Sequence, residues 1–132
     1  CYTDYQEDVR PFLAISDIFI LPSYREGFPN VVMQAGAMGV PCVVSDINGC
    51  NEIIENGLNG LIVPAKDAGA LEKALEFLIK DESTLMRMAS TSRQMIISRY
   101  DQQYLWKELL KEYRRLTNEN QVQEQKKHLY VS

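Results

Sequence analysis

The segment that most constrains this chain runs from an apolar strand, through a loop with a single carboxylate, into an apolar helix. The four apolar residues Ile18–Leu21 predict a strand that is buried on both faces of a sheet. Glu26 lies in the loop, and the helix is expected over residues 29–38, with Pro29 in its first turn and Gly39 just past its end. Ligands of open α/β sheets bind where strands end and helices begin. Glu26 is therefore predicted to face a ligand, and the unpaired amides of a helix start suit a phosphate.

Two further strands are predicted, at Cys42–Ser45 and Leu61–Val63, with one or two helical turns over Asn51–Glu55 between them. A short helix over residues 8–16 is expected to precede the first strand. Strands that alternate with helices are typical of a parallel sheet. The fold class is therefore predicted to be α/β, with a partial Rossmann-like parallel sheet of about three strands flanked by helices.

Three helices are expected after the last strand, at about residues 67–78, 83–98 and 101–116, and Asp67 is a suitable N-cap for the first of them. Apolar residues recur along these helices at helical spacing, so one face of each should be buried. The side chains expected to face the core are Val31, Ala35, Met38, Leu71, Ala74, Leu75, Leu78, Leu85, Ala89, Ile96, Leu105, Trp106, Leu109, Tyr113 and Leu116. Residues 117–132 form a polar tail, with a helix extension and disorder as the alternatives.

The composition narrows the class of protein. The 132 residues suffice for one domain with a core, and the formal charge of −4 argues against a nucleic-acid partner. The sequence contains no apolar run of membrane-spanning length and no signal-peptide pattern. Cys1, Cys42 and Cys50 lack metal-ligand spacing, and Cys42 falls in an apolar strand, where a buried free thiol is expected. These observations favour a cytoplasmic protein.

A longer motif surrounds Glu26. Its residues are Glu26, Gly27 and Phe28, then Gln34, Ala35, Gly39 and Pro41. With the stretches at residues 8–12, 16–23 and 49–64, this pattern resembles the C-terminal domain of the retaining family-4 glycosyltransferases of the GT-B fold. Their motif is E-G-F-x-x-x-x-x-E followed by A-x-x-x-G-x-P, so Gln34 stands where the family has its second glutamate. The resemblance covers roughly residues 8–113.

The resemblance implies a role for each residue of the motif. Glu26, the catalytic candidate, would hydrogen-bond the hydroxyls of the donor sugar, and Gln34 would contact the ribose, with a plain surface glutamine as the alternative. The donor diphosphate would lie against the backbone of Gly27, Phe28, Pro29, Asn30 and Val31. Arg25 and Glu52 are secondary candidates, with a solvated charge and loop support as their alternatives. No cofactor and no metal are expected, since this fold class binds the diphosphate without one and the chain has no D-x-D.

The resemblance also implies an organisation. Residues 1–116 would be a fragment of the donor-binding domain, the C-terminal half of a Rossmann-like domain, because the chain opens at Cys1 and lacks about three strands. The acceptor-binding N-terminal domain would be missing as well. The fragment alone is expected to be inactive, and the exposed edge of Ile18–Leu21 predicts a homodimer.

The expected function is the donor-binding part of a retaining glycosyltransferase. It would move a hexose from a nucleoside-diphosphate sugar to a glycan or lipid-linked acceptor, in the assembly of a surface or capsular polysaccharide. The location would be the cytoplasm, with peripheral attachment at the inner membrane face as the alternative. A non-catalytic module that binds nucleotide-sugars or acts as a scaffold is the competing hypothesis. An epimerase of the same fold ranks lower, because its motif does not match Arg25–Phe28.

Overall fold

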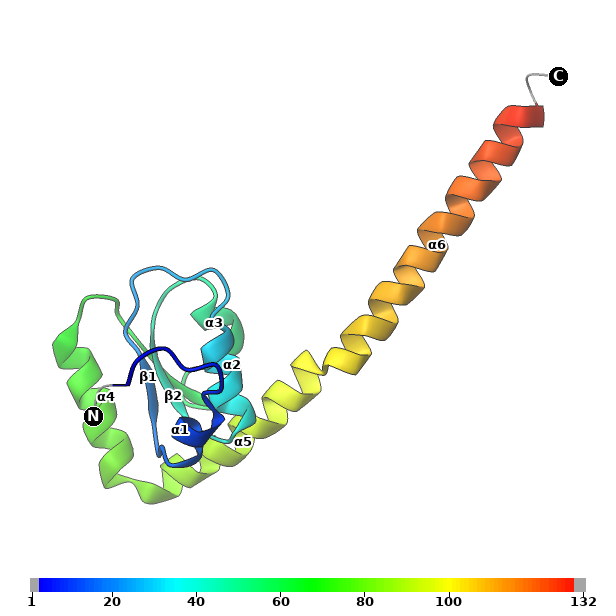
Figure 1. The fold of residues 1–132 in the computed structure, drawn as a ribbon. Helices are drawn as coiled ribbons and strands as arrows, with labels where there is room; N and C mark the ends of the chain where they lie inside the picture. The colour runs from blue at the N-terminus through cyan, green and yellow to red at the C-terminus, as the bar shows by residue number, and fades with distance from the viewer. Residues whose placement is uncertain (1–2, 130–132) are drawn as a thin grey trace. The chain divides into compact units, whose positions relative to one another are not determined.

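The computed structural model describes residues 3–129, and it gives the backbone alone for Gln102 and residues 118–129. Cys1 therefore lies outside the described residues. The elements, drawn in Figure 1, are α1 (Arg10–Ala14), β1 (Phe19–Leu21), α2 (Asn30–Ala37), β2 (Cys42–Ser45), α3 (Cys50–Ile53), β3 (Gly60–Val63), α4 (Ala68–Lys80), α5 (Glu82–Tyr100) and α6 (Gln102–Leu129). They alternate as the sequence pattern predicts, and Asp67 caps α4 by accepting a hydrogen bond of 2.9 Å from the Ala70 amide.

The three strands form a parallel sheet in the order β1-β2-β3, which confirms the predicted α/β fold with its partial Rossmann-like sheet. All four residues of β2 are buried because this strand has a neighbour on each side. Among the described residues, β1 pairs with β2 alone, and Ile20 in its middle is 40% exposed. The predicted burial of the first strand on both faces is therefore wrong, because a four-residue apolar run does not distinguish a central strand from an edge strand.

Helices cover both faces of the sheet (Figure 1). On one face, Val43 and Val63 pack against Leu78 of α4 and Met88 of α5. On the other face lies α2, and the Cys42 thiol points that way, at 3.8 Å from the Val32 carbonyl oxygen. The Cys42 side chain is fully buried and free, as the sequence predicts.

The buried face of α2 differs from the predicted one. Val32, Ala35 and Gly36 are buried, whereas Val31 is half-buried and Met38 is 37% exposed, so the face lies about one position away from the expected stripe. Gly36 explains the difference, because α5 lies directly against it. A Cβ on Gly36 would lie 2.8 Å from both Ile96 Cγ1 and Ser92 Oγ. A prediction based on the spacing of apolar side chains does not include a glycine, although Gly36 makes the close contact with α5 here.

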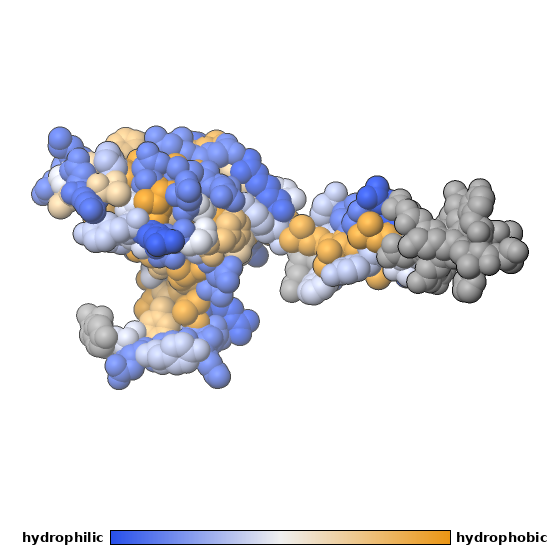
Figure 2. Space-filling model, turned by 90° about the horizontal axis from the view of Figure 1, so that it is seen from above, coloured by the Kyte–Doolittle hydropathy of each residue, from blue (hydrophilic) through white to orange (hydrophobic). Residues whose placement is uncertain are grey.

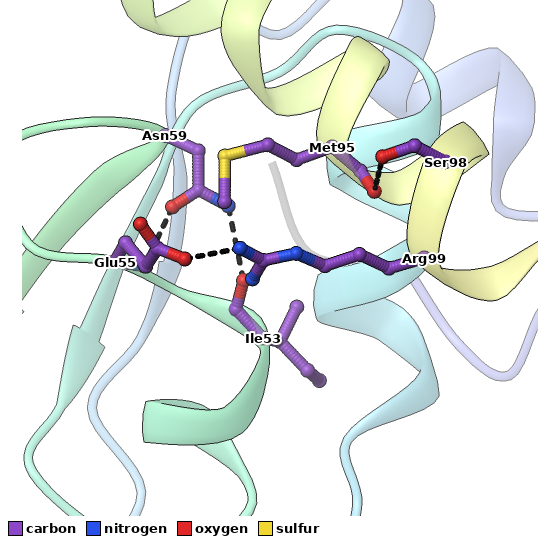
Figure 3. Close-up of polar contacts among 6 residues, drawn as sticks. All are labelled: Ile53, Glu55, Asn59, Met95, Ser98 and Arg99. Carbon is purple, nitrogen blue, oxygen red and sulfur yellow. Dashed lines mark hydrogen bonds and ion pairs between the residues drawn. The ribbon is translucent and has the colours of Figure 1, made fainter.

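A buried asparagine organises the turn before β3. Asn59 donates a hydrogen bond of 3.0 Å to the Ile53 carbonyl oxygen and accepts one of 2.7 Å from the Glu55 amide (Figure 3). The Glu55 carboxylate forms an ion pair with Arg99 near the end of α5. The hydrogen bonds of Asn59 join the end of α3 to the start of β3. The ion pair connects the last turn of α5 to the same turn.

The chain divides into two units, the first ending at Arg99 and the second beginning at Tyr100. In the described part of the second unit the chain forms the long helix α6, and Figure 2 shows apolar side chains on its surface. The predicted burial of its apolar stripe is wrong, since the described residues of that unit include no other element packed against it. The five side chains that were predicted to be buried are all exposed: Leu105, Trp106, Leu109, Tyr113 and Leu116. None of the helices in the described part of the chain has both the length and the apolarity that crossing a membrane requires.

Candidate functional site

The candidate site lies at the carboxyl edge of the sheet. Each strand of a parallel sheet ends at the same edge, so the loops after β1, β2 and β3 gather there. These loops span residues 22–29, 46–49 and 64–67. The loop after β1 carries Glu26 and leads into α2. This edge is where open α/β sheets bind ligands.

Glu26 is held in a defined position within its loop. Its side chain is half-buried, and the Ser23 hydroxyl donates a hydrogen bond of 2.8 Å to one of its carboxylate oxygens. That bond occupies one of about four acceptor positions of a carboxylate. The remaining positions can grip hydroxyl groups of a ligand. Ser23 was not among the predicted site residues, although a hydroxyl three residues before the carboxylate is visible in the sequence.

The start of α2 offers hydrogen-bond donors beside Glu26. Pro29 occupies the N-cap with an extended backbone, and its carbonyl oxygen accepts from the Val32 amide at 3.0 Å. A proline has no side-chain acceptor, so it cannot cap the amides of Asn30 and Val31. The helix dipole adds partial positive charge at this point. The arrangement suits an anion, as the sequence predicts for Gly27–Val31.

The loop after β2 touches the Glu26 loop. A Cβ added to Gly49 would lie only 2.1 Å from the Gly27 carbonyl oxygen, so the two backbones are in direct contact. Cys50 follows Gly49 and is fully buried. Burial raises the pKa of its thiol, and the charge of Glu26 raises that pKa further.

A second contact crosses from the loop after β3. The Lys66 ammonium lies 5.4 Å from the centre of the Tyr24 ring, within cation–π range. Lys66 has a φ of 65°, which is uncommon for a residue other than glycine. Both residues belong to the lining of a hollow of about 170 Å³. The lining residues are Pro22, Tyr24, Ser45, Val63, Pro64, Lys66, Asp67, Ala68 and Leu71. Lys66 was not predicted from the sequence, because no local residue pattern indicates its positive φ.

Gln34 lines a different hollow. It is exposed on α2, and the hollow of about 370 Å³ beside it also contains Glu7, Asp8, Val9, Arg10, Ala37 and Met38. Arg10 donates two hydrogen bonds of 2.8 Å to the Asp8 carboxylate and lowers the pKa of that group to about 2. The structure thus places Gln34 beside the segment before α1. It stands four residues after Asn30, on the same face of the helix.

The secondary candidates lie at the surface. Both Arg25 and Glu52 are exposed, and Glu52 belongs to the single turn of α3. Within the described residues, no group of three His, Cys, Asp or Glu side chains is placed to hold a metal ion.

The chain is similar to known sugar transferases. Its residues 1–95 match the family model described as glycosyl transferases group 1. One relative is the N,N'-diacetylbacillosaminyl-diphospho-undecaprenol alpha-1,3-N-acetylgalactosaminyltransferase of Campylobacter jejuni. The two sequences are 37% identical over 115 residues, and the alignment covers 87% of this chain and 30% of that protein. It is 31% identical over 105 residues to the capsular polysaccharide biosynthesis glycosyltransferase CapM of Staphylococcus aureus, with 80% of this chain and 28% of CapM covered.

The fold has solved counterparts too. HepE of Anabaena, in complex with UDP, aligns with a TM-score of 0.79 and 22% identity over 82% of this chain and 30% of HepE. The chain spans about 30% of the length of the curated relatives described above. The family match, the two relatives and the shared sheet lead to one conclusion. The chain belongs to the group 1 glycosyl transferases, and its parallel sheet with flanking helices is part of their GT-B fold.

Proposed function

We propose that this chain binds the nucleoside-diphosphate sugar donor of a retaining hexosyltransferase. The observation that carries the proposal is the Glu26 carboxylate, braced by Ser23 and set beside the start of α2, whose N-cap Pro29 has no side-chain acceptor. A few neighbouring residues therefore offer acceptors for sugar hydroxyls and donors for a diphosphate. HepE, which was solved with UDP, shares this fold and supports a nucleotide ligand.

In this proposal the motif residues bind different parts of the donor. Glu26 accepts hydrogen bonds from the sugar hydroxyls, and the backbone of Gly27–Val31 binds the diphosphate. Gln34 contacts the ribose through one donated and one accepted hydrogen bond. The exposure of Gln34 and the hollow of about 370 Å³ beside it support this role, since a nucleoside needs room at that point.

The chemistry assigned to this chain is electrostatic. Negative charge grows on the diphosphate as it leaves the sugar, and amides at the start of α2 with the helix dipole would stabilise that charge. We propose that no metal ion is needed for this task. Transfer that stops in excess EDTA and returns with Mg²⁺ would contradict this part of the proposal.

The acceptor is proposed to be a glycan or a lipid-linked sugar. Support comes from the Campylobacter jejuni relative, whose name specifies a diphospho-undecaprenol acceptor. An acceptor of that kind would bring the enzyme to the inner face of the membrane as a peripheral protein. CapM supports a role in polysaccharide assembly.

Titration of the natural protein with UDP and with UDP-glucose tests the assignment of Glu26. Because Glu26 is assigned to the sugar, Glu26→Ala should abolish the extra affinity for UDP-glucose while leaving the affinity for UDP. Sugar transfer should fall roughly 100-fold or more, since two charge-assisted hydrogen bonds contribute on the order of 3 kcal/mol. GDP-mannose and ADP-glucose would be used in the same way if UDP does not bind.

Glu76→Ala is the matched control. Glu76 is an exposed carboxylate on α4 that pairs with Lys80 at 2.8 Å, so its loss changes the net charge equally without touching the loop. Its variant should retain wild-type binding and transfer. Transfer by Glu26→Ala within about threefold of wild type would overturn the assignment.

A further inference from the structure

We infer that Gly49 is a positioning residue that sets the place of the Glu26 loop for the donor, an inference that rests on the function proposed above. Gly49 has a φ of 84°, and a Cβ at this position would lie 2.1 Å from the Gly27 oxygen and 3.1 Å from Pro29 Cδ. The contact therefore falls between Glu26 and Asn30, the parts of the loop assigned to the sugar and the diphosphate.

The loop after β2 is a firm support for this contact. The Asp46 amide donates a hydrogen bond of 2.7 Å to the Val63 carbonyl oxygen, which ties the loop to β3. The Asn51 side chain donates one of 2.7 Å to the Asp46 carboxylate, and the Asn51 amide donates to the Ile47 oxygen at 3.3 Å. Gly49 itself is buried.

Gly27, on the other side of the contact, has open space where a side chain would project. A Cβ added to Gly27 would meet nothing within 4 Å, and the residue is exposed. The space into which a Gly27 side chain would project is therefore open, and the contact with Gly49 limits how closely this part of the loop approaches the loop after β2. We conclude that the backbone of Gly49 is the surface against which the Glu26 loop packs.

A side chain at position 49 would push the Glu26 loop away from the loop after β2. The Gly27 oxygen would have to move by about 1 Å to leave the 2.1 Å approach and reach an allowed separation. Misplacement of a catalytic constellation by about 1 Å costs roughly 100-fold in rate. Gly49→Ala should therefore slow sugar transfer and weaken diphosphate binding more than a glycine-to-alanine change at a positive φ where the new side chain meets no neighbour.

Gly57 provides the comparison. Its φ is 81°, close to the value at Gly49, yet a Cβ there would meet nothing within 4 Å. Both Gly57→Ala and Gly49→Ala place a side chain at a positive φ, which residues with a Cβ rarely adopt, and only Gly49→Ala adds the clash with Gly27. Both variants of the natural protein would be studied at a temperature at which circular dichroism shows them folded.

The test is titration with UDP and, in parallel, with uridine. Gly49→Ala should weaken UDP binding roughly tenfold or more, the loss of about one hydrogen bond to a charged group, and leave uridine within about threefold, because the displaced loop holds the diphosphate. Gly57→Ala should bind both as wild type does. Equal losses of UDP and uridine in Gly49→Ala, or an equal loss of UDP in Gly57→Ala, overturn the inference alone. Wild-type protein that binds neither UDP, GDP nor ADP overturns the proposed function and this inference with it.

Hydrogen exchange on the wild-type protein covers the case in which Gly49→Ala does not fold. Saturating UDP should slow exchange in residues 25–31 and 46–51 together, since the second segment supports the first. Protection confined to residues 25–31 would show that the two loops are not coupled and would overturn the inference.

Discussion

Gln34 offers a ribose one acceptor oxygen and one donor group, whereas a glutamate at the same position would offer two acceptor oxygens and a charge. We predict that Gln34→Glu preserves or improves binding of the nucleoside diphosphate. A charge-assisted hydrogen bond adds roughly 1 kcal/mol, equivalent to about fivefold in affinity. Glu7 and Asp8 line the same hollow, but the charge of Asp8 is paired with Arg10, which limits the repulsion. Calorimetric titration of both proteins measures the difference.

Gln94→Glu is the control for the added charge. Gln94 is exposed on α5, so this variant changes the net charge without approaching the hollow beside Gln34. Weaker binding by more than about tenfold in Gln34→Glu alone would mean that the glutamine donates to a neighbouring acceptor instead of gripping the ribose.

The Cys42 thiol makes the stability of the fold sensitive to alkaline pH. Burial raises its pKa from 9.0 to about 12, so the unfolded chain loses this proton before the folded chain does. The stabilising contribution is therefore complete below pH 9 and is lost as the pH rises toward 12, with a slope of about 1.4 kcal/mol per pH unit. Between pH 7 and pH 10, wild-type protein should lose roughly 1.4 kcal/mol more free energy of unfolding than Cys42→Ala. Urea unfolding at both values tests this, and equal losses would contradict it.

At the scale of elements, the close approach of α2 and α5 depends on Gly36. A Cβ at this position would lie 2.8 Å from Ser92 Oγ and from Ile96 Cγ1, both on α5. Overpacking of this kind costs about 1–3 kcal/mol. We predict that Gly36→Ala lowers the free energy of unfolding by that amount, measured by urea denaturation.

Gly69→Ala is the matched helical control for Gly36→Ala. Gly69 lies in the first turn of α4, and an added Cβ would meet Asp67 Oδ1 at 3.5 Å, an ordinary contact. Alanine has the higher helix propensity, so this variant should be neutral or stabilised by up to about 1 kcal/mol. Stabilisation by Gly36→Ala as well would show that α5 moves away readily and that the contact is not a constraint.

The element pattern could be predicted where one local rule decides it. Asp67 as the cap of α4, the strand Cys42–Ser45 and the buried Cys42 thiol all follow from residue type and spacing. Met38 was assigned to the buried face of α2 because it is apolar, while the observed face is set by Gly36 against α5. A contact between distant segments leaves no local trace in the sequence.

The same distinction applies to the candidate site. The position of Glu26 in a loop at the carboxyl edge of the sheet could be predicted, because strand, loop and helix follow one another along the chain. Its neighbours Gly49 and Cys50 come from the loop and helix after the next strand, and Lys66 comes from the loop after the third. These residues meet only when the sheet forms, so their part in the site required the structure.

At the scale of the whole molecule, β1 leaves one side of the sheet without a paired strand among the described residues. Its single neighbour is β2, and Ile20 is 40% exposed. An unpaired strand edge presents amide and carbonyl groups to any other chain. We therefore predict that the 132-residue chain by itself self-associates through β1, most simply as a symmetric dimer. Light scattering at micromolar concentration measures the mass.

Two lysine variants test whether β1 is the contact. Ile20→Lys places a charge on the edge strand and should return the chain to a monomer, because edge lysines oppose strand pairing. Ile79→Lys adds the same charge at a 71% exposed position on α4 and should leave the dimer intact. A dimer that resists Ile20→Lys but dissociates with Ile79→Lys would move the interface to α4. A wild-type monomer whose β1 amides are protected from hydrogen exchange would show that the edge is shielded within a single chain, and it would overturn the prediction of pairing through β1.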